Sequence, residues 1–171
     1  MLFFAYLLAA IALWLKCTLL PQIPLIPFAP FLALSSLRCP LDKAIGCSVV
    51  AGIGVDLLSS DPLGVHALTY SLATALCYRL RNLFSAEAPS QYAMFTGLIS
   101  AALTLVHILL LFLFDRRVPF CGLWWITDWA VLPIVDAVYA LIWFAGPLAL
   151  MQTIYRRWVI FWLKRKNPFP T

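Results

Sequence analysis

The apolar run Tyr92–Phe114 limits the fold of this chain more than any other feature of the sequence. About 20 consecutive apolar residues are enough for a helix to cross the hydrocarbon core of a bilayer. The remainder of the chain is similar, since 64% of its 171 residues are hydrophobic and only 11% are charged. A soluble domain of this size does not hide so much apolar surface, so the apolar runs must face lipid. The sequence therefore predicts an all-α integral membrane protein.

Six apolar segments predict a six-transmembrane-helix bundle over residues 1–155, followed by a basic cytoplasmic tail at residues 156–171. The first segment has no basic residues before it and is interpreted as a retained helix rather than a signal peptide. The second segment is short and contains Pro27 and Pro30, so it is the weakest. Pro133 and Pro147 are expected to bend the last helix. The expected helices are Leu2–Leu20, Leu25–Leu37, Ala44–Ser59, Leu63–Leu83, Tyr92–Phe114 and Ile126–Tyr155.

The distribution of Lys and Arg indicates the orientation, because cytoplasmic loops of membrane proteins are rich in both. Six helices place nine basic residues on one side and three on the other, so both termini are expected in the cytoplasm. Without the second helix, the basic residues of the tail would lie on the opposite side of the membrane from Arg79 and Arg81. The charge count therefore favours six helices. The larger set is Arg38, Lys43, Arg79, Arg81, Arg156, Arg157, Lys164, Arg165 and Lys166, and the smaller is Lys16, Arg116 and Arg117.

The stretch Gly52–Tyr70 places glycines, acids, a proline and a histidine in otherwise apolar sequence. Asp61-Pro62 breaks the helical pattern, and Asp61 is expected to cap a second helix that starts at Leu63. This predicts a helical hairpin with a polar turn that faces outward. Asp56 and His66 would lie about 6–9 Å below that turn on opposite arms, which makes them potential partners.

Small residues are expected to let the arms of this hairpin pack closely, and a carboxylate is expected to bond them together. Gly52 and Gly64 would allow helices to approach closely, as would Gly46, Ser48 and Ala51 around Gly52. Asp56 would accept hydrogen bonds from the free backbone N–H groups at the start of the second arm, or from His66. A carboxylate held in that way needs no external ligand.

Other polar groups also fall in the outer half of the predicted bundle. They are His107, Asp136 at a similar depth, and Asp128 at the outer interface. Ionisable groups in a membrane are costly and usually face the bundle interior. Two interpretations remain open: an outward-facing polar cavity or docking site, or side chains that pair within the bundle and fix helix register.

The tail is basic at both ends and apolar in its centre, which is typical of a segment that lies in the membrane interface. Binding of a cytoplasmic protein is the alternative. The interfacial basic residues would be Arg156, Arg157, Lys164, Arg165 and Lys166.

Catalytic, metal and cofactor motifs are not recognisable in the sequence. The five cysteines are scattered and form no Cys-x-x-Cys pair. Gly52-Ile-Gly54-Val-Asp56 is near the Gly-x-Gly-Asp of intramembrane aspartyl proteases, but one inserted residue turns the aspartate by about 100° around a helix. No phosphate-binding loop or nucleic-acid module is present. The expectation is a non-enzymatic protein without metal, cofactor or nucleic acid.

The hairpin resembles the signature of the MreD family of rod-shape-determining membrane proteins. That signature is Gly-x-x-x-Asp, a short turn, then Pro-x-Gly-x-x-Ala, which corresponds here to Gly52, Asp56, Pro62, Gly64 and Ala67. The resemblance implies a scaffold subunit of the cell-elongation machinery in a bacterial inner membrane. It implies MreC, MreB, RodA and a class B penicillin-binding protein as partners. It also implies a bundle similar to the S-components of energy-coupling-factor transporters. His66, the proline-rich second helix and the basic tail are outside the signature.

A second function remains open, namely a solute-binding membrane subunit of a vitamin-type transporter. It draws on the outward polar cluster and on Ala5 and Ala9, which are similar to the small-residue coupling face of S-components.

Overall fold

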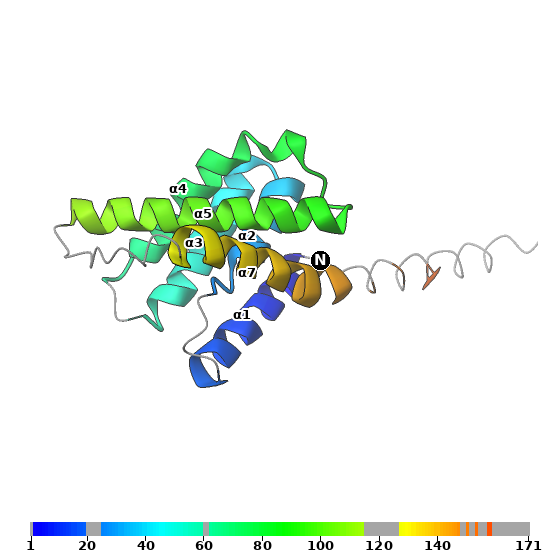
Figure 1. Cartoon of the computed structure of the whole chain (residues 1–171), viewed down its shortest axis with the longest axis horizontal. Coiled ribbons are helices and arrows are strands. Elements are labelled where there is room, and N and C mark those ends of the chain that lie inside the picture. Colours follow the sequence, from blue (N-terminus) through cyan, green and yellow to red (C-terminus); the bar gives the residue numbers. More distant parts are fainter. Residues whose placement is uncertain are drawn as a thin grey trace, which may run out of the picture.

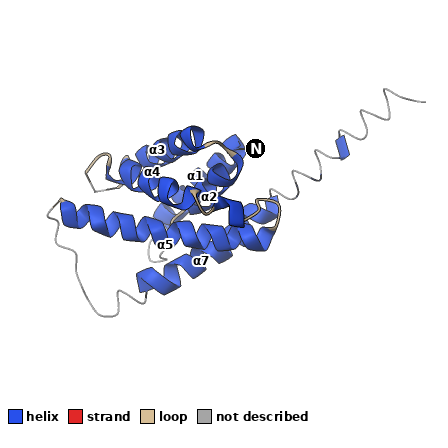
Figure 2. Ribbon diagram, turned by 90° about the horizontal axis from the view of Figure 1, so that it is seen from above, coloured by secondary structure: helices blue, strands red, loops and turns tan. Residues whose placement is uncertain are grey.

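The computed structural model describes residues 2–19, 25–59, 62–114 and 127–147, with residues 150, 153, 157 and 158. Every regular element in these ranges is helical. The helices α3 and α4 form one side of the bundle, α5 and α7 form the other, and α2 lies between them (Figure 2). The elements are α1 (Leu2–Leu19), α2 (Ala29–Arg38), α3 (Leu41–Asp56), α4 (Val65–Tyr78), the 3-10 turn η1 (Arg81–Leu83), α5 (Pro89–Leu113), the π-helical η2 (Thr127–Val131), α7 (Leu132–Tyr139) and the π-helical η3 (Ala140–Ala145).

Within the described ranges, two helices are long and apolar enough to cross a bilayer, α1 with 18 residues and α5 with 25. At about 1.5 Å per residue, α5 is about 37 Å long and exceeds the hydrocarbon thickness. A shorter apolar helix covers Trp129–Ala145. The bounds of α1 and α5 agree within one turn with those expected from the sequence. The last helix of the sequence prediction, Ile126–Tyr155, is described only in part.

The short helix α2 is the centre of the bundle, not a marginal part of it. It contacts α1, α3, α4, α5, α7, η1 and η3. Eight consecutive residues, Ala29–Ser36, are buried. With 10 residues, α2 is about 15 Å long. It begins four residues later than expected, and Pro30 lies in its first turn, where a missing N–H breaks no helical hydrogen bond.

Residues 25–28, directly before α2, are not helical, and neighbouring helices bond backbone groups here and in the first turn of α2. The Lys16 ammonium donates to the Leu25 carbonyl, and the Ile26 N–H donates to the Asp136 carboxylate at 2.9 Å. The Tyr92 hydroxyl donates to the Pro30 carbonyl at 2.8 Å. Irregular backbone at membrane depth is tolerated only where protein covers it, and here protein does.

The helix α1 packs along the outside of the bundle and runs diagonally to α5 (Figure 1). It buries Ala5, Ala9, Ala12 and Leu13 and leaves Phe3 and Trp14 on its exposed face. Three alanines of α1 therefore face the bundle, whereas Phe3 and Trp14 face outward. That arrangement suits a helix with one lipid-facing side.

The α7 stretch departs from regular helical geometry on both sides of Pro133. Pro133 lies in the first turn of α7, with a π-helical turn before that helix and another after it. Wider turns of this kind re-register the hydrogen-bond ladder of a helix. On the facing helix, a Cβ added to Gly97 would lie 3.0 Å from the Pro133 carbonyl oxygen, so this glycine permits close packing of α5 on α7.

Candidate functional site

The hairpin between α3 and α4 turns through a left-handed residue. Gly64 is the N-cap of α4 and has φ of +96°, a conformation that side-chain-bearing residues rarely adopt. Open space surrounds its missing Cβ, so the turn needs glycine for its backbone and not for close packing. The helix begins at Val65, two residues later than expected. Pro62 therefore precedes it, and its carbonyl accepts the Val65 N–H at 3.2 Å.

The carboxylate of Asp56, the last residue of α3, caps the start of α4. Its Oδ2 accepts the backbone N–H of Gly64 at 3.0 Å and that of Ala67 at 3.2 Å. Its Oδ1 accepts the His66 N–H at 3.0 Å and lies 2.9 Å from His66 Nδ1. The expected hydrogen bonds from the start of the second arm and from His66 are both present. Asp56 is only 3% exposed, so a buried charge is balanced here by donors and by the positive end of a helix dipole.

Gly52, one turn before Asp56 in α3, brings the two arms of the hairpin into contact. A Cβ added there would lie 2.3 Å from the Ala67 Cα and 2.5 Å from the Ala67 nitrogen. Real Cβ atoms do not approach backbone so closely, so only glycine fits. The expected close approach at Gly52 is confirmed, whereas Gly46 has nothing within 4 Å of its Cβ position.

Further polar contacts tie the hairpin to α5 and within itself. The rings of His66 and His107 have centroids 5.1 Å apart, and Tyr70 meets His66 edge-on at 6.2 Å. Deeper in the hairpin, the Ser48 and Thr74 hydroxyl oxygens are 2.7 Å apart. We call Asp56, His66 and His107 the hairpin cluster. It joins α3, α4 and α5 through side chains that the sequence had placed on separate helices.

Asp136 belongs to a second cluster. It is fully buried and accepts hydrogen bonds from the Ser100 hydroxyl and from the Ile26 backbone. The Lys16 ammonium donates to the Leu25 carbonyl, and its positive charge interacts favourably with the Asp136 carboxylate. The expectation that Asp136 lies at the depth of His107 is wrong. Its partner Ser100 precedes His107 by seven residues, about 10 Å along α5.

Ser100 had no signal in the sequence, because one serine in an apolar helix is ordinary. Both clusters fit the interpretation that polar groups pair within the bundle and fix helix register.

Several expected site residues lie wholly or partly outside the described part of the chain. Asp61 is one of them, so its expected capping of α4 is not described; within the described residues the capping carboxylate is Asp56. The backbone of Asp128 lies in η2, but its side chain is outside the description. Arg157 is helical and exposed. The remaining basic residues of the tail lie outside the described residues; they are Arg156, Lys164, Arg165 and Lys166.

A groove of about 560 Å³ opens beside the turn of the hairpin. Its wall on one side is the turn and the first part of α4, and its other wall is the end of α5. Leu63 is 79% exposed and Phe114 is 57% exposed at its rim. We call it the tip groove; its lining residues are Pro62, Leu63, Gly64, Val65, Leu68, Leu111 and Phe114.

The family model for rod shape-determining protein MreD matches residues 1–120 of this chain. The match covers well over half of the sequence and contains α1 to α5 with the whole hairpin. Neither a curated protein nor a solved structure matches, so the expected similarity to transporter S-components has no support from a known fold. The matched region, the apolar helices and the hairpin built on Gly52, Asp56 and Gly64 agree with one another: the chain belongs to the MreD family of membrane proteins that act in determining rod shape.

Proposed function

We propose that this protein is a non-enzymatic scaffold of the bacterial cell-elongation machinery, and that its α3–α4 hairpin positions partner membrane proteins. The observation that carries the proposal is the use of Asp56. Its two oxygens accept three backbone N–H groups and contact one imidazole nitrogen, all from the N-cap and first turn of α4. A carboxylate engaged in this way stabilises a rigid turn. The turn then presents a fixed surface to a partner.

The tip groove is the surface that this rigid turn forms. Its lining is largely apolar, and the left-handed Gly64 and exposed Pro62 shape one wall. Association of helices in lipid depends on close packing, since lipid chains are as apolar as the side chains themselves. A groove with a fixed wall supports insertion of an apolar partner segment. The proposed partners are MreC first, and then RodA, a class B penicillin-binding protein and MreB.

Co-purification in mild detergent tests this proposal. We expect tagged wild-type protein to retain MreC. Leu111→Trp should fill the tip groove and reduce the retained MreC at least threefold, whereas Leu109→Trp should not. Leu109 lies on the same helix, is 61% exposed and does not line the groove, so it controls for the added ring. If both variants retain the same amount of MreC, the tip groove is not the docking surface.

We further propose that the chain spans the inner membrane six times with both termini in the cytoplasm. The nine-to-three distribution of basic residues supports this orientation. The central position of α2 supports counting it as part of the membrane domain, although at about 15 Å it is too short to span alone. The basic tail would then lie on the cytoplasmic membrane surface, where each basic residue gains about 1 kcal/mol from anionic lipid.

The alternative function, a vitamin-type transporter subunit, loses one of its two supports. It required Ala5 and Ala9 to form a coupling face on the first helix. Both side chains are fully buried in the bundle, against α2 and its neighbours. A thermal-shift screen with vitamins separates the two functions, because a solute-binding subunit is stabilised by its ligand and a scaffold is not.

A further inference from the structure

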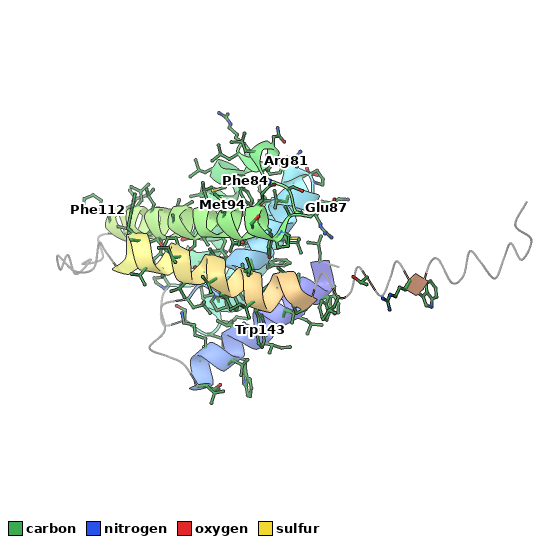
Figure 3. All side chains as sticks on the ribbon, turned by 45° about the vertical axis from the view of Figure 1, so that its right-hand side comes forward. Arg81, Phe84, Glu87, Met94, Phe112 and Trp143 are labelled. Carbon is green, nitrogen blue, oxygen red and sulfur yellow. The ribbon has the colours of Figure 1, made fainter. Side chains whose placement is uncertain are left out.

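At the end of the bundle opposite the hairpin turn, a pocket of about 520 Å³ lies between the end of α2, the end of α4 and η1. Figure 3 shows Arg81 and Phe84 there with Glu87, while Phe112 lies at the far end of α5. We call it the arginine pocket; Arg38, Cys39, Tyr78, Arg81, Asn82 and Phe84 line most of it. It lies outside both polar clusters described above.

Arg81 is held in place at this pocket by uncharged groups. Its Nη1 donates to the Cys39 carbonyl at 3.0 Å, and its guanidinium carbon lies 4.2 Å from the centroid of the Tyr78 ring. The Tyr78 hydroxyl donates to the same carbonyl at 3.4 Å. Within the described part of the chain, Arg81 has no carboxylate partner. The guanidinium of Arg81 is therefore held in a fixed position by a carbonyl and an aromatic ring, with no described carboxylate bonded to it.

A second guanidinium group lies at the same pocket. Arg38 is exposed and lines the same pocket, on the α2 side. Two guanidinium groups around one pocket favour a phosphate, because their planar donor geometry matches phosphate oxygens.

The position of the pocket in the bundle favours the phosphate of a lipid head group over a soluble phosphate. Leu37 and Phe84 contribute apolar surface to its lining, and the neighbouring Leu80 and Leu83 are 40% and 74% exposed. Charged residues gather at this end of the bundle, as expected where helices leave the hydrocarbon layer. Basic pockets between transmembrane helices at that level bind lipid head groups. We propose that the arginine pocket binds the phosphate of an anionic membrane lipid. This site does not depend on the partner-docking role of the hairpin.

The test is a lipid titration of the purified full chain in mild detergent, followed by thermal unfolding. Phosphatidylglycerol should stabilise the wild type, and the neutral lipid phosphatidylcholine should not. Arg81→Gln and Arg38→Gln should each weaken the apparent affinity for phosphatidylglycerol about fivefold, the factor that corresponds to about 1 kcal/mol per basic residue. Arg38 is exposed, so its variant keeps the test valid if Arg81→Gln fails to fold.

Arg79→Gln is the matched control, because Arg79 is exposed, lies two residues from Arg81 and does not line the pocket. Its affinity should stay within twofold of wild type. Weakening in either pocket variant, with the control unaffected, supports the proposal. Equal weakening in Arg79→Gln would mean diffuse charge attraction and overturn it. Failure of phosphatidylglycerol to stabilise the protein, while another anion does stabilise it, would also overturn the proposal. Stabilisation by inorganic phosphate would then indicate a soluble anion as the ligand, and stabilisation by polyglutamate would indicate an acidic protein segment.

Discussion

Gly52 and Ala67 hold the two arms of the hairpin at backbone contact, since a Cβ on Gly52 would lie 2.3 Å from the Ala67 Cα. The N–H of the same Ala67 donates to the Asp56 carboxylate, one turn further along α3, at 3.2 Å. The close approach and the capping interaction therefore depend on each other. Separating the arms at Gly52 would also pull the start of α4 away from the carboxylate.

Gly52→Ala is expected to destabilise the protein by about 2–4 kcal/mol, because the added methyl group meets backbone that cannot move aside without breaking the cap. Thermal unfolding in detergent measures the change. Gly46→Ala is the control on the same helix, where nothing lies within 4 Å of the added atom. It should stabilise slightly, by up to about 1 kcal/mol, through helix propensity. The prediction fails if the two variants unfold at the same temperature.

The hairpin was predictable from the sequence because its contacts are local. Asp56 and His66 are ten positions apart, and one turn between two helices is enough to bring them together. The cluster around Asp136 was not predictable in the same way. Its link to Ile26 spans 110 positions, and hydrophobic periodicity does not reveal which distant backbone N–H lacks a partner. The central role of α2 was missed for the same reason, since a short helix with prolines resembles a weak span until its neighbours are known.

Asp136 should be required for the bundle rather than for partner binding. Asp136→Leu leaves the Ile26 N–H and the Ser100 hydroxyl without their acceptor in a buried setting, at a cost of about 1–3 kcal/mol for each. We expect reduced membrane abundance and a lower unfolding temperature. Ser100→Ala removes only one donor, so its effect should be smaller. A Leu variant with normal abundance and loss of MreC alone would contradict this assignment.

The proposed topology predicts where reporters are active. A fusion at the C-terminus should be active with a cytoplasmic reporter and inactive with a periplasmic one. A fusion after Arg117 should give the opposite result, because this loop carries two of the three basic residues placed outside. Periplasmic activity of the C-terminal fusion would refute the proposed arrangement of six spans with both termini in the cytoplasm.

Asp56 is the residue on which the partner-docking proposal depends most. Asp56→Leu removes every acceptor for the N–H groups of Gly64, His66 and Ala67, so the turn should lose its fixed geometry. Asp56→Asn keeps one carbonyl oxygen as an acceptor and should be milder. His66→Ala removes the side-chain contacts with Asp56, His107 and Tyr70 but leaves the backbone cap, so its effect should be intermediate.

The measurement for this series combines membrane abundance with MreC co-purification. We expect Asp56→Leu to reduce retained MreC about tenfold or more at near-normal abundance, which corresponds to at least about 1.4 kcal/mol of association free energy. The change acts through the shape of the turn, since the Asp56 carboxylate itself is buried and already bonded. An inert Asp56→Leu would show that the hairpin is not the docking element. Loss of the protein from the membrane would make Asp56 a folding residue and leave the tip groove variant, Leu111→Trp, as the deciding experiment.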